Sequence, residues 1–137
     1  MARHVVARVG DIAPGSAKAV TVGGREIGVF HVNGGYFALL NRCPHEGAPL
    51  CRGRLSPLIE ADAPGAYRVS RHGEMLRCPW HGWEFDIRTG QSWFDPTRTF
   101  VRRYETHVES GAALMKGPYI AETFAVDVDG AYVIVDI

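Results

Sequence analysis

Two short segments of the chain combine cysteine with histidine at spacings that suit metal ligation. They are Cys43-Pro44-His45 and Cys78-Pro79-Trp80-His81, and 32 residues separate them. Thiolate sulfur and imidazole nitrogen bind iron, copper and zinc well. A single cysteine or histidine is often only a buried side chain, but both segments carry a proline after the cysteine and a glycine soon after the histidine. The pattern predicts one metal centre held between the tips of two loops.

The elements that position these loops are expected to be β-strands. Short apolar runs alternate with glycine-containing turns, and no long window keeps a helical period. Near the N-terminus two linked hairpins are predicted, with strands at Ala19–Val22, Ile27–Phe30 and Tyr36–Leu40. Their turns are Gly23-Gly24 and Asn33-Gly34-Gly35.

The C-terminal part predicts another hairpin. Phe124, Val126 and Val128 alternate with other residues, Asp129-Gly130 suits a turn, and Tyr132–Ile137 reads as the returning strand. Just before it, residues 109–121 are irregular and are expected to form a loop or one helical turn.

The middle of the chain, about residues 42–90, is dense in turn residues and has no clear period. It therefore needs another source of order, which a metal would supply. Within it, residues 57–72 are expected to form a long hairpin beside the metal site. A turn is expected at Glu60–Gly65 and a strand at Ala66–Ser70.

Length and charge narrow the function classes. The chain has 137 residues, which suits one domain. It carries 15 basic and 15 acidic side chains, so no global positive charge favours nucleic acid. The longest stretch without Asp, Glu, Lys or Arg is shorter than the roughly 20 residues that a membrane span requires. Arg3 and Arg8 interrupt the apolar segment that a secretory signal peptide would need near the N-terminus. Three cysteines cannot all pair in intramolecular disulfides. We expect a reduced, cytoplasmic protein.

The two segments and their neighbours resemble the cluster-binding loops of the Rieske family. The resemblance rests on Cys43–Leu50 (CPHEGAPL) and Cys78–Gly90 (CPWHGWEFDIRTG). It implies an all-β fold of antiparallel sheets, arranged as a sandwich or barrel. It also implies that residues 1–137 form a single domain in which about 42–90 bind the cluster.

The resemblance further implies one [2Fe-2S] cluster as the cofactor. Cys43 and Cys78 would bind one iron, and His45 and His81 the other. Zinc bound by two cysteines and two histidines remains an alternative. The exposed ring N–H groups of the two histidines are expected to couple the reduction potential to pH.

Departures from the high-potential members predict a low reduction potential. The Rieske proteins of cytochrome bc complexes carry an extra cysteine in each loop, joined as a disulfide, and a serine hydroxyl directed at a bridging sulfide. Here Trp80 and Trp83 stand in the places of the second cysteine and the serine, and Cys51 has no partner. Because fewer donors reach the cluster sulfurs, the added electron is stabilised less.

The remaining chemically interesting residues have simpler interpretations. Cys51 is expected to be a bystander, and four histidines outside the two segments are expected at surface or strand positions: His4, His31, His72 and His107. Five aromatic residues are expected to pack and exclude water, with an electron route through them as the alternative: Trp80, Trp83, Phe85, Trp93 and Phe94. Turn residues are expected to aim backbone N–H groups at sulfur: Pro44, Pro79, Gly47, Gly53 and Gly82. Three arginines flank the first loop as solvated charges or as a site for an acidic partner: Arg42, Arg52 and Arg54.

Taken together, these features favour a one-electron carrier that passes electrons from a reductase to a terminal oxygenase or a similar acceptor. The alternative is a small Rieske subunit of an oxidoreductase or dioxygenase complex, and a zinc-binding interaction module is a third reading. Catalysis by the chain alone is not expected, because only His107 follows His81 and a mononuclear iron site needs two histidines and a carboxylate.

Overall fold

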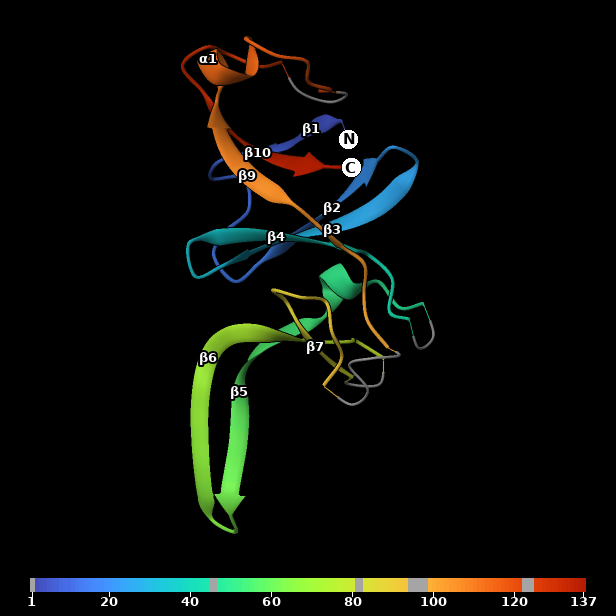
Figure 1. The fold of residues 1–137 in the computed structure, drawn as a ribbon, viewed down its shortest axis with the longest axis vertical. Helices are drawn as coiled ribbons and strands as arrows, with labels where there is room; N and C mark the ends of the chain where they lie inside the picture. The colour runs from blue at the N-terminus through green and yellow to red at the C-terminus, as the bar shows by residue number, and fades with distance from the viewer. Residues whose placement is uncertain (1, 45–46, 81–82, 94–98, 122–124) are drawn as a thin grey trace.

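The computed structural model describes residues 2–44, 47–80, 83–93, 99–121 and 125–137, with the backbone only at residue 62. Its described part contains three antiparallel sheets (Figure 1). The first has the order β1 (Arg3–Arg8), β10 (Ala131–Asp136) and β9 (Thr106–Ser110). The second has the order β2 (Ala17–Val22), β3 (Arg25–Val32), β4 (Gly35–Leu40) and β8 (Arg103–Tyr104). The third has the order β5 (Arg54–Ala63), β6 (Ala66–Arg77) and β7 (Glu84–Asp86). The predicted all-β class is confirmed.

The first two sheets pack against each other through aliphatic side chains. Val6 and Val133 from the first sheet and Ile27, Val29 and Ala38 from the second belong to one buried cluster. Strands β2, β3 and β4 form the predicted meander, with Gly23-Gly24 and Asn33-Gly34 at positive φ in its turns. Burial of this apolar surface stabilises the two packed sheets, which in turn support the loops that follow β4.

The predicted C-terminal hairpin is wrong. Strand β10 forms as expected, but it pairs with β1 on one side and β9 on the other. Residues 125–128 form no strand, and Phe124 lies outside the described residues. The N–H of Asp127 donates instead to the hydroxyl of Tyr132 (2.7 Å). Strands β1 and β9 occupy both edges of β10. Residues 125–128, which the sequence pattern predicts as its partner strand, therefore have no free edge of β10 to pair with.

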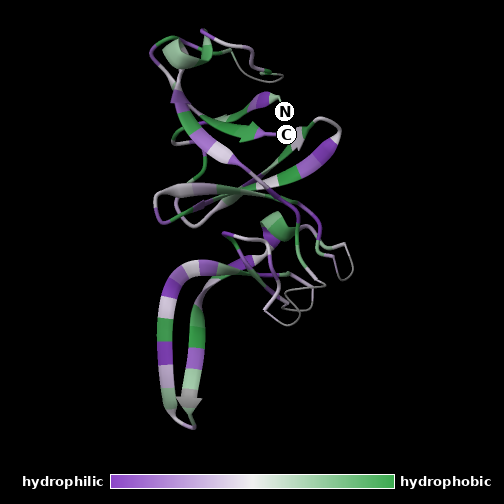
Figure 2. Cartoon of the chain, viewed as in Figure 1, coloured by the Kyte–Doolittle hydropathy of each residue, from purple (hydrophilic) through white to green (hydrophobic). Residues whose placement is uncertain are grey.

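The predicted long hairpin is present, and its distal part projects from the body as an arm (Figure 1). Its turn is tighter than expected, since Ala63 lies opposite Ala66 and only Pro64 and Gly65 connect the strands. Proline followed by a glycine at φ 82° suits a type II turn. Figure 2 shows hydrophobic and hydrophilic residues alternating along the arm. We define the arm as residues 59–69, whose described side chains are exposed.

A bend in β6 separates the arm from the root of the hairpin. Ser56 pairs with Met75 and Leu58 with Ser70, so residues 71–74 stand opposite Pro57 alone. Arg71 adopts a positive φ of 47° at this bulge. The buried carboxylate of Glu74 accepts hydrogen bonds from Arg71 and Arg88 there. The arm's direction is thus set by a charged cluster at the bend.

Two short helices complete the described structure. The 3-10 helix η1 (Leu50–Arg52) precedes β5, and α1 (Gly111–Leu114) follows β9, with the Ser110 hydroxyl accepting from the Ala113 N–H. The helix α1 confirms the single helical turn expected within residues 109–121. Neither helix has the length or apolar character needed to cross a bilayer.

Candidate metal centre

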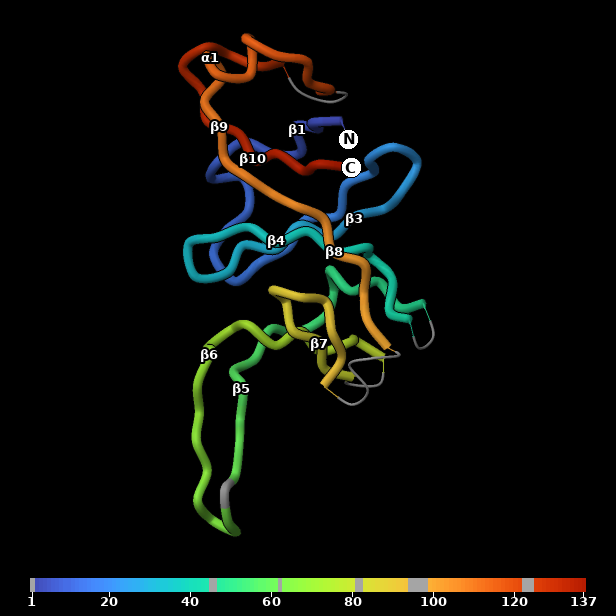
Figure 3. The backbone as a smooth tube through the Cα atoms, viewed as in Figure 1, coloured from blue at the N-terminus to red at the C-terminus, as the bar shows by residue number. Residues whose placement is uncertain are grey.

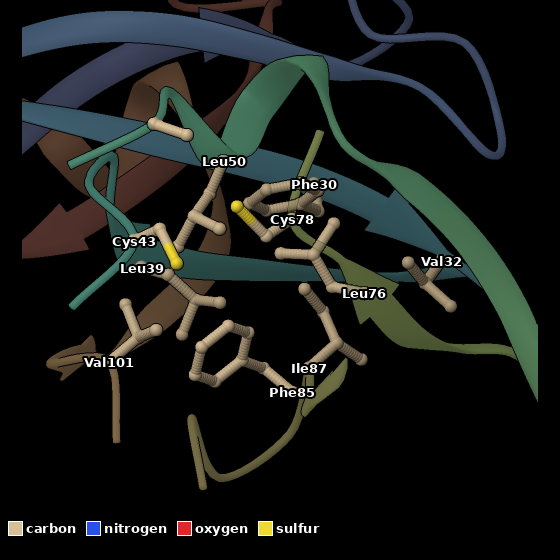
Figure 4. Close-up of a cluster of buried hydrophobic side chains, with 11 residues drawn as sticks. Phe30, Val32, Leu39, Cys43, Leu50, Leu76, Cys78, Phe85, Ile87 and Val101 are labelled. Atoms are coloured by element: carbon tan, nitrogen blue, oxygen red, sulfur yellow. The ribbon is translucent and has the colours of Figure 1, made fainter. Parts of the chain in front are cut away.

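The two cysteines of the predicted site lie in the same part of the core. Cys43 follows β4 and Cys78 follows β6, and their exposed fractions are only 1% and 4%. Both belong to one buried cluster that includes Leu39, Leu50 and Phe85. Figure 4 shows the two sulfur atoms with Leu50 between them in the view. The structure therefore brings together two thiols that the sequence separates by more than 30 residues.

The two loops close in the same way. The N–H of Cys43 donates to the carbonyl of Ala48, and the N–H of Cys78 donates to the carbonyl of Trp83, both at 2.8 Å. Each bond spans five residues from the cysteine. Figure 3 shows both loops on the side of the second sheet that faces away from the sheet of β1, β10 and β9. The similar sequences of the loops thus produce a matched local closure.

His45 and His81, the other two predicted ligands, lie outside the described residues. Within the described residues no group of three potential metal ligands gathers elsewhere in the chain. The geometry that the structure provides is consequently that of the thiol half of the site.

The four other histidines lie in strands, as expected. His31 in β3 stacks on Tyr36 with 4.5 Å between ring centroids, and its Nδ1 donates to the carbonyl of Ile12 (2.7 Å). His107 in β9 lies 2.9 Å from Asp136, measured from Nε2 to Oδ2. His4 is buried in β1, and His72 is exposed at the bend of β6. None of these positions calls for a metal ligand.

Glycine residues shape the first loop. Gly47 has φ 81°, and its N–H donates to the carbonyl of Cys43 (2.8 Å). A Cβ at Gly53 would overlap the carbonyl oxygen of Arg77, and the Gly53 N–H donates to Leu50 (2.9 Å). These two N–H groups donate to carbonyls of the loop itself and so stabilise its conformation.

Asn41 supports the site, a role that the sequence does not indicate. Its side-chain carbonyl accepts from the Cys51 N–H (2.7 Å), and its amide nitrogen lies 3.2 Å from Cys51 Sγ. The same amide donates to Glu26 (2.6 Å). Asn41 therefore joins the start of the first loop to helix η1 at the loop's end. No sequence signal marks an asparagine for this role, because its partners depend on the fold.

The aromatic residues of the second loop divide into two groups. Phe85 is fully buried, and Trp83 packs against the same cluster as the two cysteines. The predicted packing role is confirmed for these two. Trp80 and Trp93 have exposed fractions of 57% and 54%, so for them the prediction is wrong. Phe94 lies outside the described residues.

The described residues fit an iron–sulfur cluster. No disulfide joins any two of the three cysteines, all of which lie in the described part of the chain, so none links the loops. Two thiols on matched loops offer the soft ligands that such clusters use. Their apolar neighbours Leu39, Leu50 and Phe85 keep water from the sulfur side. A hard cation such as calcium would require oxygen ligands in place of these thiols.

Comparison with known proteins agrees with this chemistry. The model of the Rieske [2Fe-2S] domain family matches residues 2–105. Apoptosis-inducing factor 3 of Mus musculus is 32% identical over 104 residues, which are 76% of this chain but 14% of that protein. The chain therefore spans only a small part of that relative.

Other relatives match over most of their length. A Ralstonia ferredoxin component of naphthalene 1,2-dioxygenase/salicylate 5-hydroxylase systems is 27% identical over 77% of this chain and 86% of its own. The ferredoxin of carbazole 1,9a-dioxygenase from Nocardioides aromaticivorans IC177 shares the fold, with a TM-score of 0.61, 24% identity and 97% coverage of both chains. The matched loops, the paired thiols and the family match lead to one conclusion: this chain belongs to the Rieske [2Fe-2S] domain family, whose cofactor is one Rieske-type [2Fe-2S] cluster.

Proposed function

We propose that the chain is a one-electron carrier that passes electrons from a reductase to a terminal oxygenase or a similar acceptor. The main support for this proposal is the pair of buried thiols of Cys43 and Cys78, which lie on two loops closed by matching hydrogen bonds in a Rieske domain. Support also comes from the ferredoxin components that the chain matches over most of their length. A carrier needs a redox centre near the surface of a small domain, and this chain provides such a scaffold.

We assign Cys43 and Cys78 to one iron and His45 and His81 to the other. When bound, the cluster accepts and releases one electron at a time. The thiol pair lies on the inner side, against Leu39, Leu50 and Phe85. The matched hydrogen bonds of the two loops hold the cysteine backbones in place, which limits rearrangement of the ligands when the charge changes.

We also propose that residues 1–137 act as a single domain, with about 42–90 forming the cluster-binding part. The root of the third sheet supports this, because Leu76 and Phe85 share a buried cluster with Phe30 and Leu39 of the second sheet. A cytoplasmic location is part of the proposal, since three cysteines without a disulfide among them suit a reducing compartment.

The function is tested by reconstituting electron transfer. The purified holoprotein is added to a naphthalene dioxygenase system from which its own ferredoxin is omitted, with reductase, oxygenase and substrate present. We expect product formation that depends on both the added protein and the oxygenase. Product formed without the oxygenase would contradict a pure carrier. Protein that contains zinc and no acid-labile sulfide would contradict the redox role altogether.

A further inference from the structure

Four arginines border the two loops of the candidate site. Arg42 immediately precedes Cys43, and Arg77 immediately precedes Cys78. Arg52 ends helix η1, and Arg54 begins β5. The side chain of Arg42 lies along the first loop, because a Cβ built on Gly47 would be 3.2 Å from Arg42 Nε. We call Arg42, Arg52, Arg54 and Arg77 the basic belt.

Contacts between loops and strands connect the members of the basic belt. Asn41 binds Cys51, and so draws the neighbouring residues 42 and 52 toward each other. Gly53 packs against the carbonyl of Arg77. Arg54 lies directly opposite Arg77 in the antiparallel pair of β5 and β6, and residues opposite each other point to the same face of a sheet.

The pairing of Arg54 with Arg77 is unfavourable for folding alone. Like charges directly opposite each other destabilise a sheet. Only Arg77 has an acidic partner among the described residues, Glu84, at 3.0 Å. In the described part of the chain no carboxylate forms an ion pair with Arg42, Arg52 or Arg54, and all four arginines are exposed. The fold therefore keeps positive charge beside the site and leaves most of it free for another molecule.

Within the described residues, two carboxylates contact the basic belt or its neighbour Asn41. Glu84 is engaged by Arg77, and Glu26 accepts a hydrogen bond from Asn41. Glu46 is present in the first loop by sequence and lies outside the described residues. Residues 42–54 thus carry three arginines against one glutamate.

The sheet of β1, β10 and β9 lacks a comparable positive excess. Residues 106–137 carry five carboxylate side chains and one lysine, and β1 adds Arg3, which pairs with Glu109, and Arg8. Figure 1 shows β9, α1 and β10 at the end away from the loops. A positive surface beside the loops orients the molecule in the field of an acidic partner before contact.

We propose that the basic belt is the docking surface for an acidic face of the redox partner protein. The inference rests on the proposed carrier function and adds the chemistry of the partner, namely carboxylates around the partner's own redox centre. The interface is expected to be small and short-lived, as electron-transfer contacts are. Attraction between the belt and those carboxylates brings the loops that hold Cys43 and Cys78 against the partner.

The test uses small redox ions, so that it does not depend on the partner's identity. The dithionite-reduced holoprotein is mixed in a stopped-flow instrument with ferricyanide, an anion, or with hexaamminecobalt(III), a cation. We expect the ferricyanide rate constant to fall about three- to tenfold between low and high ionic strength. The double variant Arg52→Glu/Arg54→Glu should lower the low-salt ferricyanide rate by a similar factor and raise the rate with the cation. The matched control, Arg8→Glu on β1, should change either rate less than twofold.

Two further measurements separate the causes. The midpoint potential of each variant shows whether a rate has changed because the driving force has changed. A ¹⁵N NMR titration with hexacyanocobaltate(III), which is redox-inert, should shift backbone resonances near Arg52 and Arg54 and leave residues 106–114 unchanged.

The outcomes distinguish this proposal from the carrier function itself. Equal effects of Arg52→Glu/Arg54→Glu and Arg8→Glu, or a ferricyanide rate that rises with salt, would overturn the docking surface while leaving a competent carrier. Holoprotein that neither takes up an electron from dithionite nor passes one to either ion would instead overturn the carrier function.

Discussion

Arg71 donates a hydrogen bond to the carboxylate of Glu74 across the bulge of β6, with 2.9 Å between Nε and Oε1. Arg88 Nε lies 2.8 Å from the same oxygen, and Arg71 also donates to Asp86 (2.8 Å). Arg71 holds a positive φ of 47°, a conformation that costs a non-glycine residue of order 1–3 kcal/mol. The charged cluster offsets this strain and fixes the bend from which the arm leaves the body.

The variant Glu74→Gln is expected to destabilise the protein in a pH-dependent manner. Burial would raise the pKa of Glu74, but hydrogen bonds from Arg71 and Arg88 outweigh burial and hold the pKa below its ordinary value of 4.5. The stabilisation is therefore present above pH 4.5 and is lost as the pH falls through the lower pKa of the folded protein.

Urea unfolding of the holoprotein measures this effect. At pH 7 the free energy of unfolding should fall by about 1–3 kcal/mol, and the difference should narrow below pH 4.5. The control Glu105→Gln, which removes an exposed pair with Arg103, should change stability by less than about 1 kcal/mol. If Glu74→Gln lowers the free energy of unfolding by the same amount at every pH, the ionised carboxylate of Glu74 does not stabilise the fold as predicted.

Removal of the arm is expected to leave the metal centre intact. Leu58 lies opposite Ser70, so residues 59–69 can be replaced by an Asn-Gly turn. Since an isolated two-stranded hairpin is marginally stable, the free energy of unfolding should change by no more than about 1 kcal/mol. Iron and sulfide content should match the wild type.

A substitution in the core at the root of the hairpin should destabilise the protein much more than removal of the arm. Leu76 is fully buried at the root of the same hairpin, and Leu76→Ala should cost about 2–5 kcal/mol. Loss of the cluster from the truncated protein would show that the arm has a structural role which its exposed side chains do not reveal.

Cys43 and Cys51 are expected to respond differently to replacement by serine. Cys43→Ser should abolish cluster binding, because a hydroxyl is a poor substitute for a thiolate ligand. Cys51→Ser is the matched control and should retain full iron and sulfide, since Cys51 contacts Asn41 rather than the other two thiols. Normal sulfide content in Cys43→Ser would contradict the ligand assignment. His81→Cys is expected to keep a cluster and lower its potential, because a thiolate adds negative charge.

The reduction potential is expected to lie in the low part of the Rieske range. The three cysteines of the described chain form no disulfide, so the bridge of the high-potential proteins is absent, and tryptophan stands at position 83. A redox titration should place the midpoint below about +100 mV. A higher value would show that other groups in this chain stabilise the added electron.

Much of the second sheet and the location of the site could be predicted from the sequence, because short-range patterns determine both. The strands β2, β3 and β4 follow one another through glycine turns, and the two ligand segments are local motifs. The pairing of β10 with β1 and β9 joins the two ends of the chain, which no local pattern encodes. The role of Asn41 depends in the same way on the distant Glu26 and on Cys51, which the fold brings together.

The account depends most on two thiolates at one iron and two imidazoles at the other. Pulsed electron paramagnetic resonance of dithionite-reduced protein containing ¹⁵N-histidine tests this ligand set directly. We predict two strongly coupled nitrogen nuclei in the wild type and the loss of one or both in a variant of His45 or His81. A paramagnetic cluster without any histidine nitrogen coupling, or a colourless protein that gives no signal, would contradict the assignment.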